Sequence, residues 1–184
     1  MPNDRLAEQL ARRLDEPDCP HLAVFLPSVA ALPPVLKCFY ALGEARNGWL
    51  LHASRPGQIE GERRQLAAAG LDVARLEAER RLTLYEFDLS VDPDDWADGW
   101  SQTLDARLAA GFDAVWYARF PIPPTDADVE ALLPFEEAWM RRSRDRPVVT
   151  LCPYIASEAA ASAAYGHFER LSASHDDVLQ SGGD

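Results

Sequence analysis

The chain has 184 residues, of which 47% are hydrophobic and 26% are charged. This length and composition allow the chain to bury a hydrophobic core, so they favour one globular domain and exclude a disordered or fibrous protein. The 18 basic and 30 acidic residues give a net charge of −12 at pH 7, which repels polyphosphate backbones and anionic headgroups, so we expect no direct nucleic-acid or membrane partner.

The first predicted element is a helix over residues 3–14, which carries Leu6, Leu10 and Leu14. A four-residue spacing places the three leucines on one stripe of the helix. The stripe either packs on the body of the domain or pairs with a second chain. We expect it to support a homodimer.

Five short apolar runs of strand length follow this helix. They cover residues 21–26, 49–53, 82–87, 114–119 and 148–152. At least three of them are apolar enough to be buried on both faces, which is typical of strands in a parallel sheet.

Helix signals occupy the segments between these runs. Asp92 provides an N-cap, and Pro93 a first-turn residue, for a helix whose apolar stripe begins at Trp96. Another helix is expected to begin at Thr125, with a kink at Pro134. Further helical segments are expected over residues 36–43 and 58–69, in a short turn capped by Asp72, and over residues 158–171 after the cap Ser157.

Strands and helices that alternate five times indicate a parallel sheet with helices on both faces. We therefore predict a three-layer α/β domain with a mostly parallel sheet of about five strands. We assign residues 1–16 to an N-terminal helix, 17–179 to the α/β domain and 180–184 to a disordered tail. Ligands of such sheets bind beyond the carboxyl ends of the strands.

The loop after the first predicted strand argues against phosphate binding. Residues 26–34 read Leu-Pro-Ser-Val-Ala-Ala-Leu-Pro-Pro, without a glycine and with three prolines that have no N–H to donate. Lys37 is the only lysine in the chain, and Cys38 follows it where a phosphate loop needs Ser or Thr. Arg119 ends the fourth predicted strand, where a magnesium site would need a carboxylate. Metal-assisted phosphoryl transfer is therefore disfavoured.

Several segments resemble known families. Residues 43–54 (Gly-Glu-Ala-Arg-Asn-Gly-Trp-Leu-Leu-His-Ala-Ser), 65–73 and 81–85 look like the corresponding parts of KaiC and RecA-like ATPases. A closer resemblance, to the MEDS domain, is carried by residues 21–25 (His-Leu-Ala-Val-Phe), 36–43, 146–154 (Arg-Pro-Val-Val-Thr-Leu-Cys-Pro-Tyr) and 174–179 (Ser-His-Asp-Asp-Val-Leu).

The resemblance to the MEDS domain implies a RecA-like body without a working phosphate loop. It also implies that the strands lie in the order third, second, fourth, fifth, first. MEDS domains are the sensory part of the dichloromethane regulator DcmR and of many bacterial signalling proteins. The resemblance therefore implies a sensory domain that binds a small molecule or a protein partner and passes on a conformational change.

We expect no metal site and no cofactor. Cys19 and His21 begin a strand, whereas His52 and Cys152 end strands and so lie at the opposite edge of the sheet. In the strand order that the resemblance implies, the fourth strand separates His52 from Cys152 by roughly 10 Å, too far for one zinc ion. For Cys152, a buried structural cysteine is the alternative.

Nucleophilic catalysis is not indicated either. The sequence has no Gly-x-Ser-x-Gly and no Cys-x-x-Cys motif, and no basic residue is an obvious partner for the Cys152 thiol. The three cysteines have no paired spacing, which suits a reducing compartment, and no apolar run approaches the roughly 20 residues of a membrane helix. We expect a cytoplasmic, non-catalytic protein.

The residues predicted to bind a ligand lie near the carboxyl ends of the strands: Phe25, His52, Arg119, Cys152 and Tyr154. Arg119 and Tyr154 belong to neighbouring strands in the implied order and are expected to flank a crevice for a neutral or anionic ligand. Arg119 would hold an anion, and Tyr154 would offer a flat apolar face. A surface ion pair is the alternative for Arg119.

Taken together, these features predict a bacterial sensory or signalling domain. No kinase or DNA-binding segment follows it in this sequence, so we expect the signal to leave through a partner surface. Two alternatives stay open. One is a divergent KaiC-like nucleotide-binding ATPase, and the other is a structural adaptor without a ligand.

Overall fold

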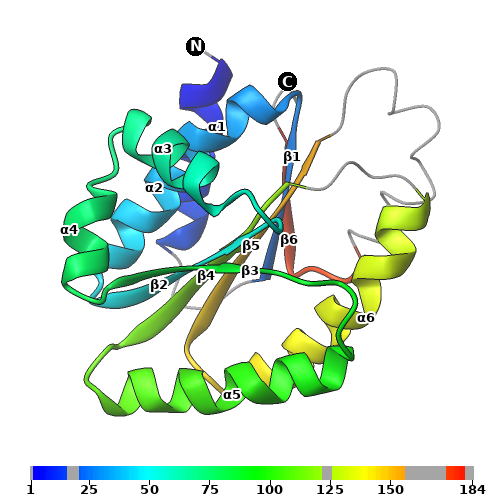
Figure 1. The fold of residues 1–184 in the computed structure, drawn as a ribbon. Helices are drawn as coiled ribbons and strands as arrows, with labels where there is room; N and C mark the ends of the chain where they lie inside the picture. Colours follow the sequence, from blue (N-terminus) through cyan, green and yellow to red (C-terminus); the bar gives the residue numbers. More distant parts are fainter. Residues whose placement is uncertain (1, 16–20, 122–125, 156–172, 181–184) are drawn as a thin grey trace.

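The computed structural model describes residues 2–15, 21–121, 126–155 and 173–180 (Figure 1). Helices and strands alternate along most of this length, as the sequence predicts. The elements are α1 (Pro2–Leu14), β1 (His21–Leu26), the 3-10 helix η1 (Val29–Ala31), α2 (Leu32–Ala45), β2 (Gly48–Ser54), α3 (Ile59–Ala68), α4 (Val73–Ala78), β3 (Leu82–Glu86), α5 (Pro93–Ala109), β4 (Ala114–Arg119), α6 (Asp126–Ser143), β5 (Val148–Ile155) and β6 (Asp177–Gln180).

All strand pairs in the sheet are parallel, and the strand order is β3-β2-β4-β5-β1-β6. The first five positions confirm the order that the family resemblance implies. The sixth strand, β6, was not predicted, and it pairs with β1 from Leu22↔Asp177 to Phe25↔Gln180. Gln180, assigned to a disordered tail, is the last residue of this strand. Residues 181–184 lie outside the described part of the chain.

Two layers of helices cover the sheet, which confirms the three-layer α/β fold. Figure 1 shows α1 to α4 on one face and α5 and α6 on the other. Side chains on each strand alternate between these two layers. On β1, for example, Leu22 and Val24 belong to the core under α1 to α4, whereas Ala23 and Phe25 belong to the core under α5 and α6.

The leucine stripe of α1 packs on the body of the domain. Leu6, Leu10 and Leu14 are each at most 2% exposed and share one core with residues of α2. Arg13 also forms an ion pair with Asp177 of β6 at 2.7 Å. The stripe is therefore covered by its own chain and does not supply the surface for the expected homodimer.

The helix caps follow the sequence signals. The Asp92 carboxylate accepts hydrogen bonds from the backbone N–H groups of Asp94 and Asp95 at 2.9 and 3.1 Å, and Asp72 accepts one from Arg75 at 3.2 Å. α2 begins earlier than predicted, because prolines are tolerated in a first helical turn. The predicted caps Thr125 and Ser157 and the predicted helix 158–171 lie outside the described residues. None of the described helices is both long and apolar enough to cross a membrane.

Strand β5 is longer than predicted, and this matters for the site. The prediction ended it at Cys152, but the strand continues through Pro153 to Ile155. Its neighbour β4 pairs with it only as far as Leu151, whereas β1 pairs with it along its whole second half. A proline is tolerated at position 153 because this part of β5 pairs with a neighbouring strand on one side only. Cys152 therefore lies inside the sheet and not at its carboxyl edge.

Candidate functional site

The five residues predicted to bind a ligand divide between the two faces of the sheet. Phe25, Cys152 and Tyr154 belong to the core on the α5 and α6 side, and Arg119 contacts Tyr154 there. His52 contacts Tyr40 of α2 and Glu62 of α3 on the other face. β4 also lies between the strands of His52 and Cys152, as expected.

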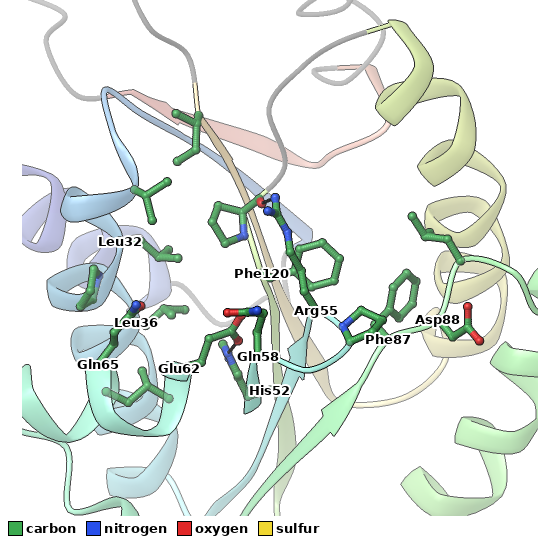
Figure 2. Close-up of a pocket in the computed structure, with 17 residues that line it drawn as sticks. Leu32, Leu36, His52, Arg55, Gln58, Glu62, Gln65, Phe87, Asp88 and Phe120 are labelled. Carbon is green, nitrogen blue, oxygen red and sulfur yellow. Dashed lines mark hydrogen bonds and ion pairs between the residues drawn. The ribbon is translucent and has the colours of Figure 1, made fainter. Parts of the chain in front are cut away.

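A cleft of about 1030 Å³ opens at the carboxyl edge of the sheet, where ligands bind in folds of this type (Figure 2). One wall is mainly aliphatic and comes from η1, α2 and Leu66 of α3. Polar side chains of α3 and the loops after β2, β3 and β4 form the rest. The residues that line it include Val29, Leu32, Pro33, Leu36, His52, Arg55, Gln58, Glu62, Gln65, Leu66, Phe87, Asp88, Leu89, Phe120 and Pro121.

His52 lines this cleft and forms hydrogen bonds to two neighbouring side chains. Its Nε2 lies 2.7 Å from a Glu62 carboxylate oxygen, and its Nδ1 lies 2.8 Å from the Tyr40 hydroxyl. With its proton on Nε2, the imidazole donates to Glu62 and accepts from Tyr40. Burial and the Glu62 charge raise the pKa of Tyr40 well above its ordinary value, so the phenol stays protonated. His52 and Glu62 thus present a fixed polar pair to the cleft.

Arg55 supplies a positive charge at the same edge. Its Nη2 donates to the carbonyl of Pro121 at 2.6 Å, and its guanidinium lies 5.2 Å from the centre of the Phe120 ring. The turn that carries it is closed by Gly57, which has a φ of 73° and whose N–H donates to Glu86 at 2.8 Å. Figure 2 shows Arg55 beside Phe120.

A second polar group lies on the opposite face of the sheet, under α6. Its centre is Glu136, which is 5% exposed. Glu136 Oε1 accepts from Arg119 Nε at 3.1 Å and lies 3.4 Å from the Tyr154 hydroxyl. Glu136 Oε2 lies 2.9 Å from His21 Nε2 and 3.4 Å from Cys152 Sγ. The carboxylate therefore joins α6 to β1, β4 and β5.

This environment shifts the pKa values of the group strongly. Burial opposes the charge on Glu136, but Arg119 and His21 hold its pKa well below the ordinary value. Burial also opposes the charge on His21, yet Cys152 and Glu136 beside it raise its pKa to about 10. For Cys152, burial and the Glu136 charge raise the pKa of the thiol. The ion pairs therefore outweigh desolvation for Glu136 and His21.

These neighbours do not form a catalytic triad. In a Cys-His-acid triad the thiol and the acid face different nitrogens of the imidazole, so that the acid orients the base. Here Cys152 Sγ lies 3.2 Å from His21 Nε2, the same nitrogen that faces Glu136. The raised thiol pKa also opposes a reactive thiolate. The geometry thus favours no nucleophilic role for Cys152.

Arg119 and Tyr154 do not line the cleft at the carboxyl edge. Arg119 is 2% exposed; besides the Glu136 ion pair, its Nη1 donates to the carbonyls of Phe120 and Pro153, and its guanidinium lies 4.6 Å from the Tyr154 ring centre. The ion pair considered as its alternative exists, but it is buried and not on the surface. Phe25 stacks on Tyr154 with ring centres 5.3 Å apart.

Three members of this group were not among the predicted site residues: His21, Glu136 and His175, whose imidazole ring centre lies 4.1 Å from that of His21. One signal in the sequence marks Glu136, which lies on the same helical stripe as Leu132, Phe135 and Trp139, so a carboxylate interrupts an apolar face. His21 was placed at the far edge from Cys152 because β5 was predicted too short.

The segment that would hold phosphate in a RecA-like ATPase has a different structure here. β1 leads into η1 and then into α2, whose first turn contains two prolines in place of N–H donors. Lys37 is exposed on α2 and does not line the cleft.

A three-layer α/β body with this strand order, a proline-rich first loop and an open carboxyl edge is a RecA-like domain without a phosphate loop. The family model of the MEDS domain (MEthanogen/methylotroph, DcmR Sensory domain) matches residues 21–169. The chain therefore belongs to the MEDS family of sensory domains. No curated protein matches this chain.

Proposed function

We propose that this chain is a non-catalytic sensory domain that binds a small molecule in the cleft between α2, α3 and the loops after β2, β3 and β4. The observation that carries this proposal is the cleft itself. It has about 1030 Å³ of space at the usual ligand position of an open parallel sheet, and it combines an apolar wall with a few fixed polar groups.

The lining indicates the chemistry of the ligand. Leu32, Leu36 and Leu66 offer an aliphatic surface, and the His52–Glu62 pair offers a directed polar contact. The charged side chains are one arginine, Arg55, and two carboxylates, so a bound anion would meet a net negative wall. A small, mostly apolar, neutral molecule with one hydrogen-bonding group fits this surface best.

Binding there reaches several elements at once. A molecule in the cleft would touch the start of α2, α3 and three loops that belong to different strands. If it binds one arrangement of these elements better than another, it shifts the population between the two arrangements. The signal would then pass to a partner protein or a second subunit. The setting we propose is the bacterial cytoplasm, without direct contact with nucleic acid or membrane.

The two alternatives have less support. A nucleotide-binding ATPase needs backbone N–H donors after β1, where this chain has Pro27 and a first helical turn with two prolines. A structural adaptor without a ligand has no need of an open carboxyl edge, whereas this edge holds a large cleft.

The test uses a tryptophan to fill the mouth of the cleft. Val29 lines it and is 53% exposed, whereas Val91 is 41% exposed and does not line it. Native mass spectrometry of freshly purified protein and a thermal-shift panel of short alcohols, ketones, amides and carboxylic acids identify a binder. Val29→Trp is expected to abolish its binding, and the matched control Val91→Trp to retain it. Equal binding by the two variants, or no binder in either measurement, would contradict the proposal.

A further inference from the structure

Four side chains with metal-ligating atoms converge under α6: His21 of β1, Glu136 of α6, Cys152 of β5 and His175, just before β6. We call them the buried quartet. Their ligating atoms all lie within 4.8 Å of one another. His175 is 9% exposed and the other three are at most 5% exposed. They come from four separate segments, so the tertiary fold alone brings them together.

The spacing within the quartet is close to that around a four-coordinate metal ion. The distances are 2.9 Å from His21 Nε2 to Glu136 Oε2, 3.2 Å from His21 Nε2 to Cys152 Sγ, and 3.4 Å from Cys152 Sγ to Glu136 Oε2. A tetrahedral zinc ion holds its nitrogen, oxygen and sulfur ligands roughly 3.3–3.6 Å from one another. Small outward shifts of a few side-chain atoms would therefore open the required space. The imidazole rings of His21 and His175, 4.1 Å apart at their centres, already lie side by side.

Outer contacts of the kind that orient metal ligands are present. Glu136 directs Oε2 to the quartet, while its Oε1 is held by Arg119 at 3.1 Å and lies 3.4 Å from the Tyr154 hydroxyl. The Ser174 hydroxyl lies 3.0 Å from Nδ1 of His175. One thiolate and one carboxylate offset the charge of a divalent ion, and the Arg119 guanidinium, which stays on the other oxygen of the same carboxylate, leaves the whole site with one positive charge.

We propose that the buried quartet binds one divalent transition-metal ion of the zinc class. Nitrogen and sulfur ligands select such an ion over Mg²⁺ and Ca²⁺, which prefer oxygen ligands. Because four protein ligands fill a tetrahedral shell, the ion has no open position for a water or a substrate. The site therefore stabilises the fold and does not hydrolyse a substrate. Binding releases two protons to solvent, the thiol proton of Cys152 and the proton on Nε2 of the His21 imidazolium.

The alternative is that the quartet is complete as a hydrogen-bonded ion-pair network. In that arrangement the His21 imidazole and the Cys152 thiol both donate to Glu136 Oε2. The two arrangements differ in one measurable respect, which is whether the Cys152 sulfur becomes a thiolate ligand when metal is added. The quartet lies on the face opposite His52, so this proposal stands or falls independently of the ligand cleft.

The experiment removes the other two thiols and leaves the quartet intact. In a Cys19→Ser/Cys38→Ser protein, Cys152 is the only cysteine. Titration with Co²⁺ is expected to give one ion per chain, the visible absorption of a tetrahedral site and a thiolate-to-cobalt charge-transfer band. Zn²⁺ should displace Co²⁺ and raise the melting temperature, and a chelator should reverse that rise. Absence of Co²⁺ binding, or binding without the charge-transfer band, would overturn the proposal.

Ligand substitutions identify the site. His175→Gln removes the most exposed of the four ligands and should weaken Co²⁺ binding by more than about 10-fold. His52→Gln makes the same change on the opposite face and should leave Co²⁺ affinity unchanged. Circular dichroism checks that both variants are folded. Equal affinity in the two variants would show that the metal binds elsewhere and would also overturn the proposal.

Discussion

Arg119 at the end of β4 and Glu136 in the middle of α6 form an ion pair that is almost fully shielded from water. Arg119 Nε donates to Glu136 Oε1 at 3.1 Å, and the two side chains are 2% and 5% exposed. The pair fixes the helix to the centre of the sheet. It also explains why a positive side chain next to the carboxyl edge is not available to a ligand.

Removal of Glu136 should destabilise the domain strongly, because Arg119 would be left as an uncompensated buried charge. In metal-free buffer with a chelator, Glu136→Ala is expected to lower the free energy of unfolding by about 3–5 kcal/mol. Urea denaturation measures the loss. The double variant Arg119→Met/Glu136→Leu, which replaces both charges by apolar side chains, should lose much less. If the single and double variants were equally destabilised, the buried charge would not be the cause.

Two helical glycines should respond in opposite directions to alanine. A methyl group at Gly43 of α2 would lie 2.6 Å from Cγ of the buried Trp116, so Gly43→Ala should cost about 1–3 kcal/mol of stability by overpacking. Gly99 of α5 has open space around it, and Gly99→Ala should stabilise the protein by roughly 0.5–1 kcal/mol through helix propensity. Thermal and urea unfolding measure the stability of both variants. A change of stability in the same direction for both would contradict the packing at these two glycines.

The leucine stripe of α1 should contribute to stability within one chain and not to assembly. Leu10 is fully buried in the core that α1 shares with α2, so Leu10→Ala should cost about 2–5 kcal/mol. Its mass in light scattering should equal that of the wild-type protein under native conditions. A change in subunit number with little loss of stability would instead assign the stripe to a contact between chains.

The carboxylate of Asp105 should titrate at an unusually low pH. Both nitrogens Nε and Nη2 of Arg146 donate to it, at 2.7 and 2.9 Å, and this hydrogen bonding lowers the pKa of Asp105. Its folded-state pKa is depressed, so its contribution to stability is present above the unfolded pKa and is lost as the pH falls through the folded value. Carboxyl carbon NMR should show the low pKa, and Arg146→Gln should raise it towards the ordinary value. An unchanged titration in the variant would count against this ion pair.

Millimolar ATP or GTP with magnesium should neither stabilise the protein nor be hydrolysed. The physical reason is the absence of N–H donors at the prolines after β1 and at the start of α2. Thermal-shift and phosphate-release assays test both parts. Magnesium-dependent turnover that Lys37→Ala abolishes would overturn this expectation.

Local sequence patterns were sufficient to locate β1 to β5, but not β6. Apolar runs of four to eight residues bounded by turn and cap residues identify β1 and β4 at their observed limits, and side-chain chemistry identifies the Asp92 cap. These signals are local because hydrogen-bonding geometry and burial repeat within a few residues of the chain. The open carboxyl edge also follows from topology, because parallel strands bring their ends together at one edge.

The composition of each polar site was decided only by the tertiary structure. His21, Glu136 and Cys152 are separated by more than 100 residues at the extremes, and their contact depends on strand register, on which sheet face each side chain occupies, and on how α6 docks. A three-residue error in the end of β5 was enough to hide the contact between His21 and Cys152. Likewise, the α1 leucines show an apolar stripe in the sequence, but whether their own chain or another covers it depends on long-range packing. Such contacts have no local repeat, so no short-range pattern encodes them.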